Sequence, residues 1–234
     1  MISTIAQKPA LKLAKEHRPV FIQGLEDLYD LIVPIPQDLA PIVVKHHGFP
    51  VSPIDKPTVY FSAKEDENYH YLLYCVYHRM DWSYGQPGGP LRDSLDTHQH
   101  DFEGVLRAIP GDDSGEYEWA CSVFHKELHL TRGWMVFSIE SQGHGIFPAL
   151  RRRDFLTQSR NEVVYAHYRL VNINREWSPE QWIKLRQVFN ANGVNLPDQW
   201  NDWRIRKKYG KETDGLIFTD PAKLRELAHK CQLI

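Results

Sequence analysis

Residues 69–77 limit the folds open to this chain more than any other segment. The segment contains no Gly or Pro, and its apolar and aromatic side chains alternate in two rows, which begin with Tyr69, Tyr71 and Leu73 and with His70, Leu72 and Tyr74. A period of two in aromatic and β-branched residues is typical of a strand. The sequence therefore predicts a fold built around extended chain.

Further segments have strand-like patterns. Residues 102–110 carry Val105, Leu106 and Ile109 and end in a Pro-Gly turn. Residues 118–130 and 134–140 are separated by Thr131-Arg132-Gly133, and a short connection that contains Gly predicts a hairpin. Residues 163–171 are expected to form one more strand.

Helical patterns lie on both sides of this region. Residues 23–33 place three leucines at helical spacing before Pro34. Ser178-Pro179-Glu180-Gln181 is a capping box before a helix that should reach residue 192, and a last helix is expected at 221–231.

These patterns predict one α+β domain over residues 1–234. Its expected parts are a flexible arm or short helix at 1–18, a strand-rich metal-binding core at 69–171 and a helical region at 178–234.

Composition excludes several classes of protein. The 28 basic and 30 acidic side chains nearly balance, so bulk charge does not favour nucleic acid as a partner. No transmembrane segment is expected, because no run of residues is long and apolar enough. Residues 1–18 lack the pattern of a signal peptide, which predicts a cytoplasmic protein, or a secreted one if a leader is removed. Cys75 and Cys121 lie in apolar runs and are expected to be buried free thiols.

Metal-ligating residue types gather at residues 97–103, Thr-His-Gln-His-Asp-Phe-Glu. In a strand, Asp101 and Glu103 share one face, and His98 and His100 share the other. If the strand begins near Asp101, His98 lies in the preceding loop and can turn toward the two carboxylates, while His100 points away.

Asp81 adds a third carboxylate at the end of the preceding strand. If the two strands are neighbours, Asp81 and Asp101 lie at the same end of the sheet. Three carboxylates and one imidazole favour a hard divalent cation, Mg²⁺ or Ca²⁺, with Zn²⁺, Mn²⁺ and Fe²⁺ as alternatives. The competing interpretation is a polar loop at a strand start, in which Asp101 caps backbone amides.

The same residues resemble the signature of the necrosis- and ethylene-inducing-peptide-like proteins. In that family a tyrosine-rich strand ends in Asp, and a loop leads to a Gly-His-Arg-His-Asp-Trp-Glu heptapeptide. Residues 97–103 match it with Thr, Gln and Phe in place of Gly, Arg and Trp. The chain departs from the family in lacking a signal peptide and a disulfide, and in its longer loop from Asp81 to His98.

The resemblance implies a central β-sandwich of mainly antiparallel strands with helices packed outside it. It also implies a divalent cation held by Asp81, His98, Asp101 and Glu103. Two pocket histidines beside the ion would correspond to His125 and His144.

Two functions are consistent with such a site. One is recognition of a small-molecule, glycan or glycolipid-like ligand, as implied by the cytolysins that the chain resembles. The alternative is a metal-dependent hydrolase, in which the ion lowers the pKa of a bound water and His125 or His144 transfers the proton. The sequence contains no P-loop, dinucleotide fingerprint or nucleophile elbow.

Overall fold

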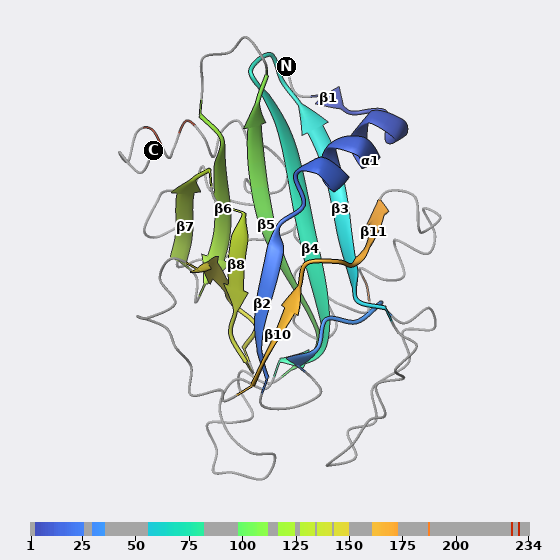
Figure 1. Ribbon diagram of the computed structural model, residues 1–234, viewed down its shortest axis with the longest axis vertical. Helices are drawn as coiled ribbons and strands as arrows, with labels where there is room; N and C mark the ends of the chain where they lie inside the picture. Colours follow the sequence, from blue (N-terminus) through green and yellow to red (C-terminus); the bar gives the residue numbers. More distant parts are fainter. Residues whose placement is uncertain are drawn as a thin grey trace.

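The computed structural model describes residues 3–25, 30–35, 56–81, 98–111, 117–124, 127–133, 135–141, 143–149 and 161–172, together with Gln187, Glu226 and His229 (Figure 1). Apart from isolated helical positions, these residues form one helix and eleven strands. The elements are β1 (Ser3–Thr4), α1 (Gln7–Glu16), β2 (Val20–Leu25), β3 (Thr58–Glu65), β4 (Tyr69–Asp81), β5 (His98–Pro110), β6 (Trp119–Phe124), β7 (Glu127–Arg132), β8 (Val136–Ile139), β9 (Ile146–Pro148), β10 (Asn161–Tyr165) and β11 (Arg169–Asn172).

The larger sheet has the strand order β1-β3-β4-β5-β6-β7, and β11 pairs with β3 in parallel beyond this path. Its other neighbouring strands are antiparallel. At its centre, β4 and β5 are 13 residues long each and pair from Tyr69↔Pro110 to Asp81↔His98. The strands predicted at 69–77 and 102–110 are thus confirmed as neighbours, and both are longer than predicted.

The smaller sheet has the order β10-β2-β8-β9. β2 pairs with β10 in antiparallel fashion on one side and with β8 in parallel on the other. Strands from three separate parts of the chain therefore meet here: β2, the consecutive strands β8 and β9, and β10.

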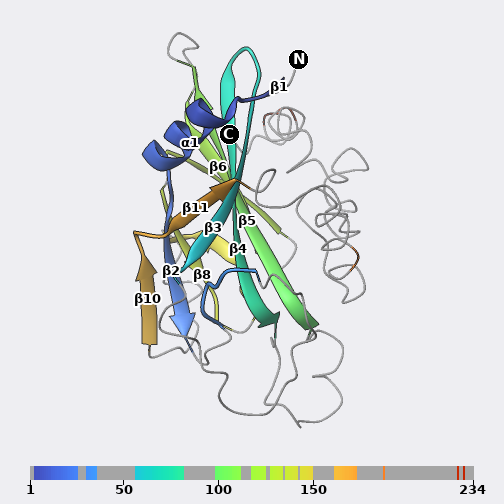
Figure 2. The ribbon, with the colours of Figure 1, turned by 90° about the vertical axis from the view of Figure 1, so that its right-hand side faces the viewer.

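One apolar core joins the two sheets. Side chains of the larger sheet, such as Tyr74 and Val105, belong to the same buried cluster as Phe21, Phe137 and Ile146 of the smaller sheet. Figure 2 shows β2 and β10 alongside the larger sheet, with α1 near one end. The described residues therefore form a strand-rich structure, mostly antiparallel, with little helix.

Both rows of β4 are buried, which explains its aromatic composition. Tyr71 and Tyr77 on one face and Leu72 and Tyr74 on the other are all 2% exposed or less. Cys75 is also buried on this strand, and Cys121 is buried on β6; both are free thiols, as predicted. Burial raises the pKa of the Cys121 thiol to about 12, so it stays protonated near neutral pH.

Three sequence-based expectations about elements are wrong. Residues 23–25 belong to β2, not to a helix, because hydrogen-bonded partners on both sides outweigh the helical spacing of the leucines. The hairpin formed by β6 and β7 turns between Phe124 and Glu127, and not at residues 131–133. Gly133, with φ of 55°, lies instead on the connection from β7 to the smaller sheet.

The third correction concerns residues 163–171. The chain leaves β10 after Tyr165 and enters β11 at Arg169, which lies in the other sheet. The alternation in this segment therefore belongs to two short strands rather than to one.

The remaining expected helices are described in part. Within residues 1–18 the chain forms α1, whose Ala10 and Ala14 are fully buried. Gln187, Glu226 and His229 are helical and exposed, and the rest of the expected helices at 178–192 and 221–231 lie outside the described residues. No helix in the described part of the chain has the length and apolar character needed to cross a membrane.

Candidate metal centre

The pairing of β4 with β5 brings the first two residues of the site together. His78 lies directly opposite Asp101, and their side chains are 0% and 4% exposed. Because the register is continuous along the pair, this contact follows from the same alignment that joins Asp81 to His98.

His144 and Asp30 reach this point from two irregular segments. His144 lies between β8 and β9, in a turn where the Glu140 N–H donates to the Gly145 carbonyl at 3.1 Å. Asp30 begins a segment that is held to β4 by a hydrogen bond from the Val33 N–H to the Tyr77 carbonyl, 3.1 Å long. Both side chains are fully buried.

The imidazole of His144 lies between two carboxylates. Its Nδ1 is 2.9 Å from Asp101 Oδ2, and its Nε2 is 3.1 Å from Asp30 Oδ1. Burial alone would lower the pKa of His144, but hydrogen bonds to both carboxylates and their negative charges outweigh it and raise the pKa to about 9. At neutral pH the ring is an imidazolium that donates to both carboxylates. His144 also has φ of 51°, a left-handed backbone that a non-glycine residue adopts at a cost of about 1–3 kcal/mol.

His78 is held by Gln23, an inward-facing residue of β2 that is fully buried. The Gln23 amide nitrogen donates to the carbonyls of Glu140 and Gly24 at 3.0 and 3.2 Å, which fixes the orientation of the amide. The amide oxygen is 3.0 Å from His78 Nε2, so that nitrogen must carry the proton and donate. In the neutral ring, His78 Nδ1 therefore has an unprotonated lone pair.

Burial lowers the pKa of His78 well below its usual 6.5, and the positive charge of His144 acts in the same direction. The two rings are stacked, with centroids 3.9 Å apart and planes 9° apart. A neutral and a charged imidazole thus lie face to face, because only His144 has a carboxylate within hydrogen-bond distance of each nitrogen.

Both imidazole rings turn the same nitrogen, Nδ1, toward the Asp101 carboxylate. Each Nε2 is held by an oxygen acceptor, Gln23 in one case and Asp30 in the other. Each Nδ1 faces Asp101 Oδ2, at 3.9 Å from His78 and 2.9 Å from His144. One ligand atom of each of His78, Asp101 and His144 lies within 4.8 Å of the others, as a metal site requires. Acceptors on the outer nitrogens are the usual support of metal-ligating histidines.

These distances can be compared with those around a metal ion. Two ligand atoms bound at 2.0–2.1 Å in tetrahedral geometry are about 3.4 Å apart. The two separations from Asp101 Oδ2, 2.9 and 3.9 Å, lie on either side of that value. The two rings are stacked with planes 9° apart, so binding of one ion by both Nδ1 atoms also requires the rings to turn relative to each other and His144 to lose its Nδ1 proton.

The predicted site residues fall into four groups. Asp101, a predicted ligand, and His144, a predicted pocket histidine, lie together in the cluster. Glu103 is half-buried two residues along β5 and lies opposite Val76, outside the cluster. His125 lies outside the described residues.

Asp81 and His98 are described only through their backbone, which pairs at the end of β4 and β5. The expectation that His98 lies in a loop before the strand is wrong, because β5 begins at His98 and the partner strand extends to meet it.

Sequence reasoning missed three residues of the site. His78 could have been found by extending the antiparallel register, since any alignment that pairs Asp81 with His98 also pairs His78 with Asp101. Gln23 and Asp30 gave no such signal, because residues 23–33 were assigned to a helix and both reach the site through contacts distant in sequence.

Comparison of the chain with protein-family models, with curated proteins and with solved structures gave no match. The resemblance to the necrosis- and ethylene-inducing-peptide-like proteins therefore stays a prediction.

Proposed function

We propose that this protein binds one divalent transition-metal ion between His78, Asp101 and His144. The observation that carries the proposal is the lone pair of His78 Nδ1, which is buried, makes no hydrogen bond to any residue that the structure describes, and faces the Asp101 carboxylate at 3.9 Å. Two acceptors that face each other away from water are unfavourable unless a cation lies between them.

A purely structural ion cluster explains less of the geometry. The Asp30–His144–Asp101 arrangement alone contains two carboxylates and one imidazolium, and such buried ion clusters occur without metals. It gives no reason for a second imidazole whose outer nitrogen is fixed by Gln23 and whose inner nitrogen faces Asp101 without a hydrogen bond to any described residue. A cation bound to Nδ1 of His78 would account for both nitrogens of this ring.

The ligand types favour particular metals. Two imidazole nitrogens and one carboxylate suit Zn²⁺, Fe²⁺ or Mn²⁺, whereas Mg²⁺ and Ca²⁺ prefer oxygen ligands. We therefore rank Zn²⁺ and Fe²⁺ above the Mg²⁺ or Ca²⁺ expected from the sequence. Of the four ligands that the resemblance implies, Asp81, His98, Asp101 and Glu103, this cluster contains Asp101.

The activity that this ligand set supports best is metal-dependent hydrolysis. Three protein ligands are typical of catalytic zinc sites. The fourth coordination position of the ion is then open to water or substrate, and the ion polarises the molecule bound there. His144 then acts as a ligand rather than as the acid or base. Glu103, half-buried on the same face of β5, is our candidate for proton transfer.

Recognition of a glycan or glycolipid-like ligand remains the second proposal, with a β-sandwich like that of the family that the chain resembles. The shared core of the two sheets supports the sandwich assignment. Recognition through Ca²⁺ receives less support, since the cluster offers two nitrogen ligands.

Metal analysis of protein purified without metal-affinity steps tests the proposal. We expect about one Zn²⁺ or Fe²⁺ per chain, and loss of the ion in His78→Ala and Asp101→Asn. His70→Ala is the matched control, because His70 pairs with Glu65 on a partly exposed part of β4 and should not affect metal content.

The hydrolase assignment has a separate test. Metal-loaded protein is assayed with p-nitrophenyl acetate and bis-p-nitrophenyl phosphate, and Glu103→Gln is compared with the unaltered chain. We expect activity that chelation removes, Zn²⁺ restores and Glu103→Gln lowers at least tenfold without loss of metal. Turnover that survives chelation would contradict metal-dependent hydrolysis. It would not bear on metal binding, which the metal analysis above tests separately.

A further inference from the structure

Strand β10 forms one edge of the smaller sheet. It pairs with β2 from Asn161↔Leu25 to Tyr165↔Phe21, and no described strand pairs with its other side. In Figure 2, β10 lies at the outer margin of the described elements. Residues of an antiparallel strand direct their backbone N–H and C=O groups alternately to its two sides, so β10 also directs such groups away from β2. The backbone of β10 can therefore pair with a further strand.

The inner face of β10 fixes the strand in the fold. Tyr165 belongs to the buried core, and its hydroxyl accepts a hydrogen bond from the Ile32 N–H at 3.4 Å. Val163 packs against the same core. Because the strand is already ordered in the single chain, pairing with a further strand costs little additional ordering of β10.

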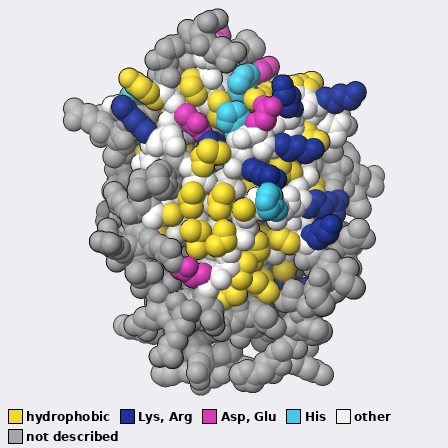
Figure 3. Space-filling view, in the orientation of Figure 1, with side chains coloured by type: hydrophobic (Ala, Val, Ile, Leu, Met, Phe, Trp, Pro, Cys, Tyr) yellow, Lys and Arg dark blue, Asp and Glu magenta, His cyan; other side chains and the backbone are white. Residues whose placement is uncertain are grey.

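The outer face of β10 continues an apolar row from β2. Val164 lies opposite Ile22; Val164 is 61% exposed and Ile22 is partly exposed. On the other side of β2, Val20 lies opposite Val136, and both are partly exposed. Figure 3 shows hydrophobic side chains gathered over this part of the surface. Contiguous exposed apolar area of this kind marks an interaction surface.

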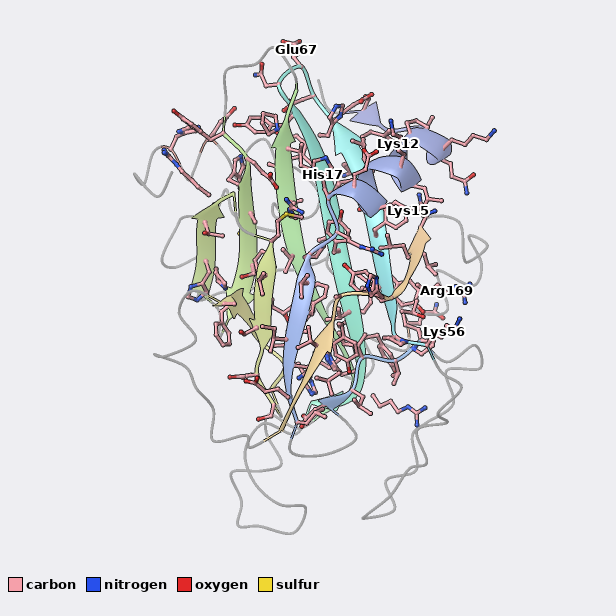
Figure 4. The ribbon with its side chains drawn as sticks, viewed as in Figure 1. Lys12, Lys15, His17, Lys56, Glu67 and Arg169 are labelled. Carbon is pink, nitrogen blue, oxygen red and sulfur yellow. The ribbon has the colours of Figure 1, made fainter. Side chains whose placement is uncertain are left out.

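Strand β10 lacks the features that usually protect a free edge, which are Lys, Pro or a very short strand. β9, at the opposite end of the smaller sheet, has three residues, ends in Pro148 and contacts strands of the larger sheet. β10 has five residues, Asn-Glu-Val-Val-Tyr, and contains neither Lys nor Pro. The cationic side chains labelled in Figure 4 belong to α1, to β11 and to the chain before β3, namely Lys12, Lys15, Arg169 and Lys56.

The charges at the two ends of β10 are opposite. Glu162 is exposed near the start of the strand. Just beyond its end, His167 is exposed, and its Nδ1 lies 3.4 Å from the Arg18 guanidinium. When two β10 strands pair in antiparallel fashion, the start of each lies beside the end of the other. The acidic end of one copy then meets the basic end of the other, so the strand is complementary to itself.

We propose that two copies of this chain pair through β10, antiparallel and about a two-fold axis, so that the smaller sheet continues from one copy into the other. An axis beside Val164 places this side chain next to Val164 of the second copy and joins the apolar rows of both. The same residues are used on both copies, so the interface closes on itself. Pairing of five residues buries less than the about 1,200–2,000 Å² of a stable interface, and we expect a dissociation constant in the micromolar range.

Sedimentation-velocity ultracentrifugation of the full chain over a range of micromolar concentrations tests this dimer. We expect a reversible monomer–dimer equilibrium that Val164→Lys weakens at least tenfold, because it places two like charges side by side at the axis. Tyr117→Lys is the matched control, since Tyr117 is 66% exposed and lies under Arg132 of the larger sheet, and it should associate as the unaltered chain does. Circular dichroism checks that both variants are folded.

Cysteine cross-linking tests the position of the axis. Val164→Cys in a Cys231→Ser background should form an intermolecular disulfide under mild oxidation, and Tyr117→Cys in the same background should not. Cys75 and Cys121 are buried and do not compete.

The proposal is overturned if the unaltered chain stays monomeric at every concentration, or if Val164→Lys associates as strongly as the unaltered chain. It also fails if Tyr117→Cys cross-links as readily as Val164→Cys. Monomeric protein that sediments with phosphatidylcholine vesicles, and no longer does so in Val164→Lys, would assign the apolar row to a lipid surface and would overturn the dimer as well.

Discussion

At the scale of single residues, two stacked histidines have opposite proton affinities because their neighbours differ. His144 has a carboxylate at each nitrogen, and the charged ring is favoured. His78 has an amide oxygen at one nitrogen and no hydrogen bond at the other, and burial favours the neutral ring. This difference makes the stability of the protein without metal depend on pH in two directions.

Stability should fall on the alkaline side. The pKa of His144 is raised from 6.5 to about 9 in the folded protein, so its contribution is complete below pH 6.5 and is lost as the pH rises through 9. A shift of this size corresponds to on the order of 3 kcal/mol in the free energy of unfolding. Urea unfolding of chelator-treated protein between pH 6.5 and 10 measures the loss, and a flat profile would contradict the assignment.

Stability should also fall on the acid side. The folded-state pKa of His78 is lowered, so its contribution is present above pH 6.5 and is lost as the pH falls and the unfolded chain takes up the proton. The same unfolding series, extended to pH 5, measures this loss. Because carboxylates also titrate there, His78→Phe is the comparison, and it should reduce the slope between pH 6.5 and 5.

Gln23 should control metal affinity without binding the metal. Gln23→Met removes the acceptor at His78 Nε2 and frees the ring to change tautomer, which should weaken metal binding about 10- to 100-fold. Competition with a chromophoric chelator measures the change, and nitrogen-15 shifts of the imidazoles report the tautomer independently. The same substitution at Gln7, the first residue of α1, is the control. An unchanged affinity and an unchanged tautomer in Gln23→Met would show that Gln23 has no such role.

Part of the site could be read from the sequence at this scale. Asp101 and His144 were found, because residue type and a motif pointed to them. Gln23 and Asp30 are ordinary polar residues in sequence, and only the tertiary structure brings them to the two imidazoles. Local patterns contain no information on such contacts.

At the scale of elements, β2 connects the core to the site. Phe21 and Gln23 alternate with Val20 and Ile22, so one row of the strand supplies both the core aromatic and the residue that holds His78. A change that displaces β2 should therefore disturb metal binding as well as stability.

Phe21→Ala should lower the free energy of unfolding by about 3–5 kcal/mol, because Phe21 is fully buried between the sheets. Val164→Ala on the neighbouring β10 should cost below about 0.5 kcal/mol, because Val164 is 61% exposed. Denaturant unfolding of the two variants measures both values. Equal losses would mean that β2 is not part of the core as described.

Elements were predictable where the pattern was long. The alternation of β4 extends over many residues and gave the strand, its neighbour β5 and their common end. The short strands β2, β10 and β11 were missed or merged, because four to six residues fit more than one period. Their identity comes from pairing with strands far away in sequence.

At the scale of the whole molecule, the centre joins parts of the chain that are far apart. Gln23 and Asp30 precede β4 and β5 in sequence, His78 and Asp101 lie on these two strands, and His144 follows them. An ion bound to His78, Asp101 and His144 would link β4, β5 and the connection between β8 and β9.

Metal binding should therefore stabilise the entire fold. Binding to the folded state alone raises stability by about 2.7 kcal/mol when the free metal concentration is 100 times the dissociation constant. Thermal unfolding at increasing buffered Zn²⁺ should show a rising midpoint in the unaltered chain and in His70→Ala. The midpoint should not change in His78→Ala, and a similar rise in that variant would place the stabilising ion elsewhere.

X-ray absorption spectroscopy of the Zn²⁺-loaded protein tests the central claim most directly, because it reports the ligands of the ion itself. We predict two imidazole nitrogens at about 2.0–2.1 Å and at least one oxygen ligand, with one imidazole lost in His78→Ala. A first shell made only of oxygen, or one unchanged in His78→Ala, would contradict a metal centre at His78, Asp101 and His144.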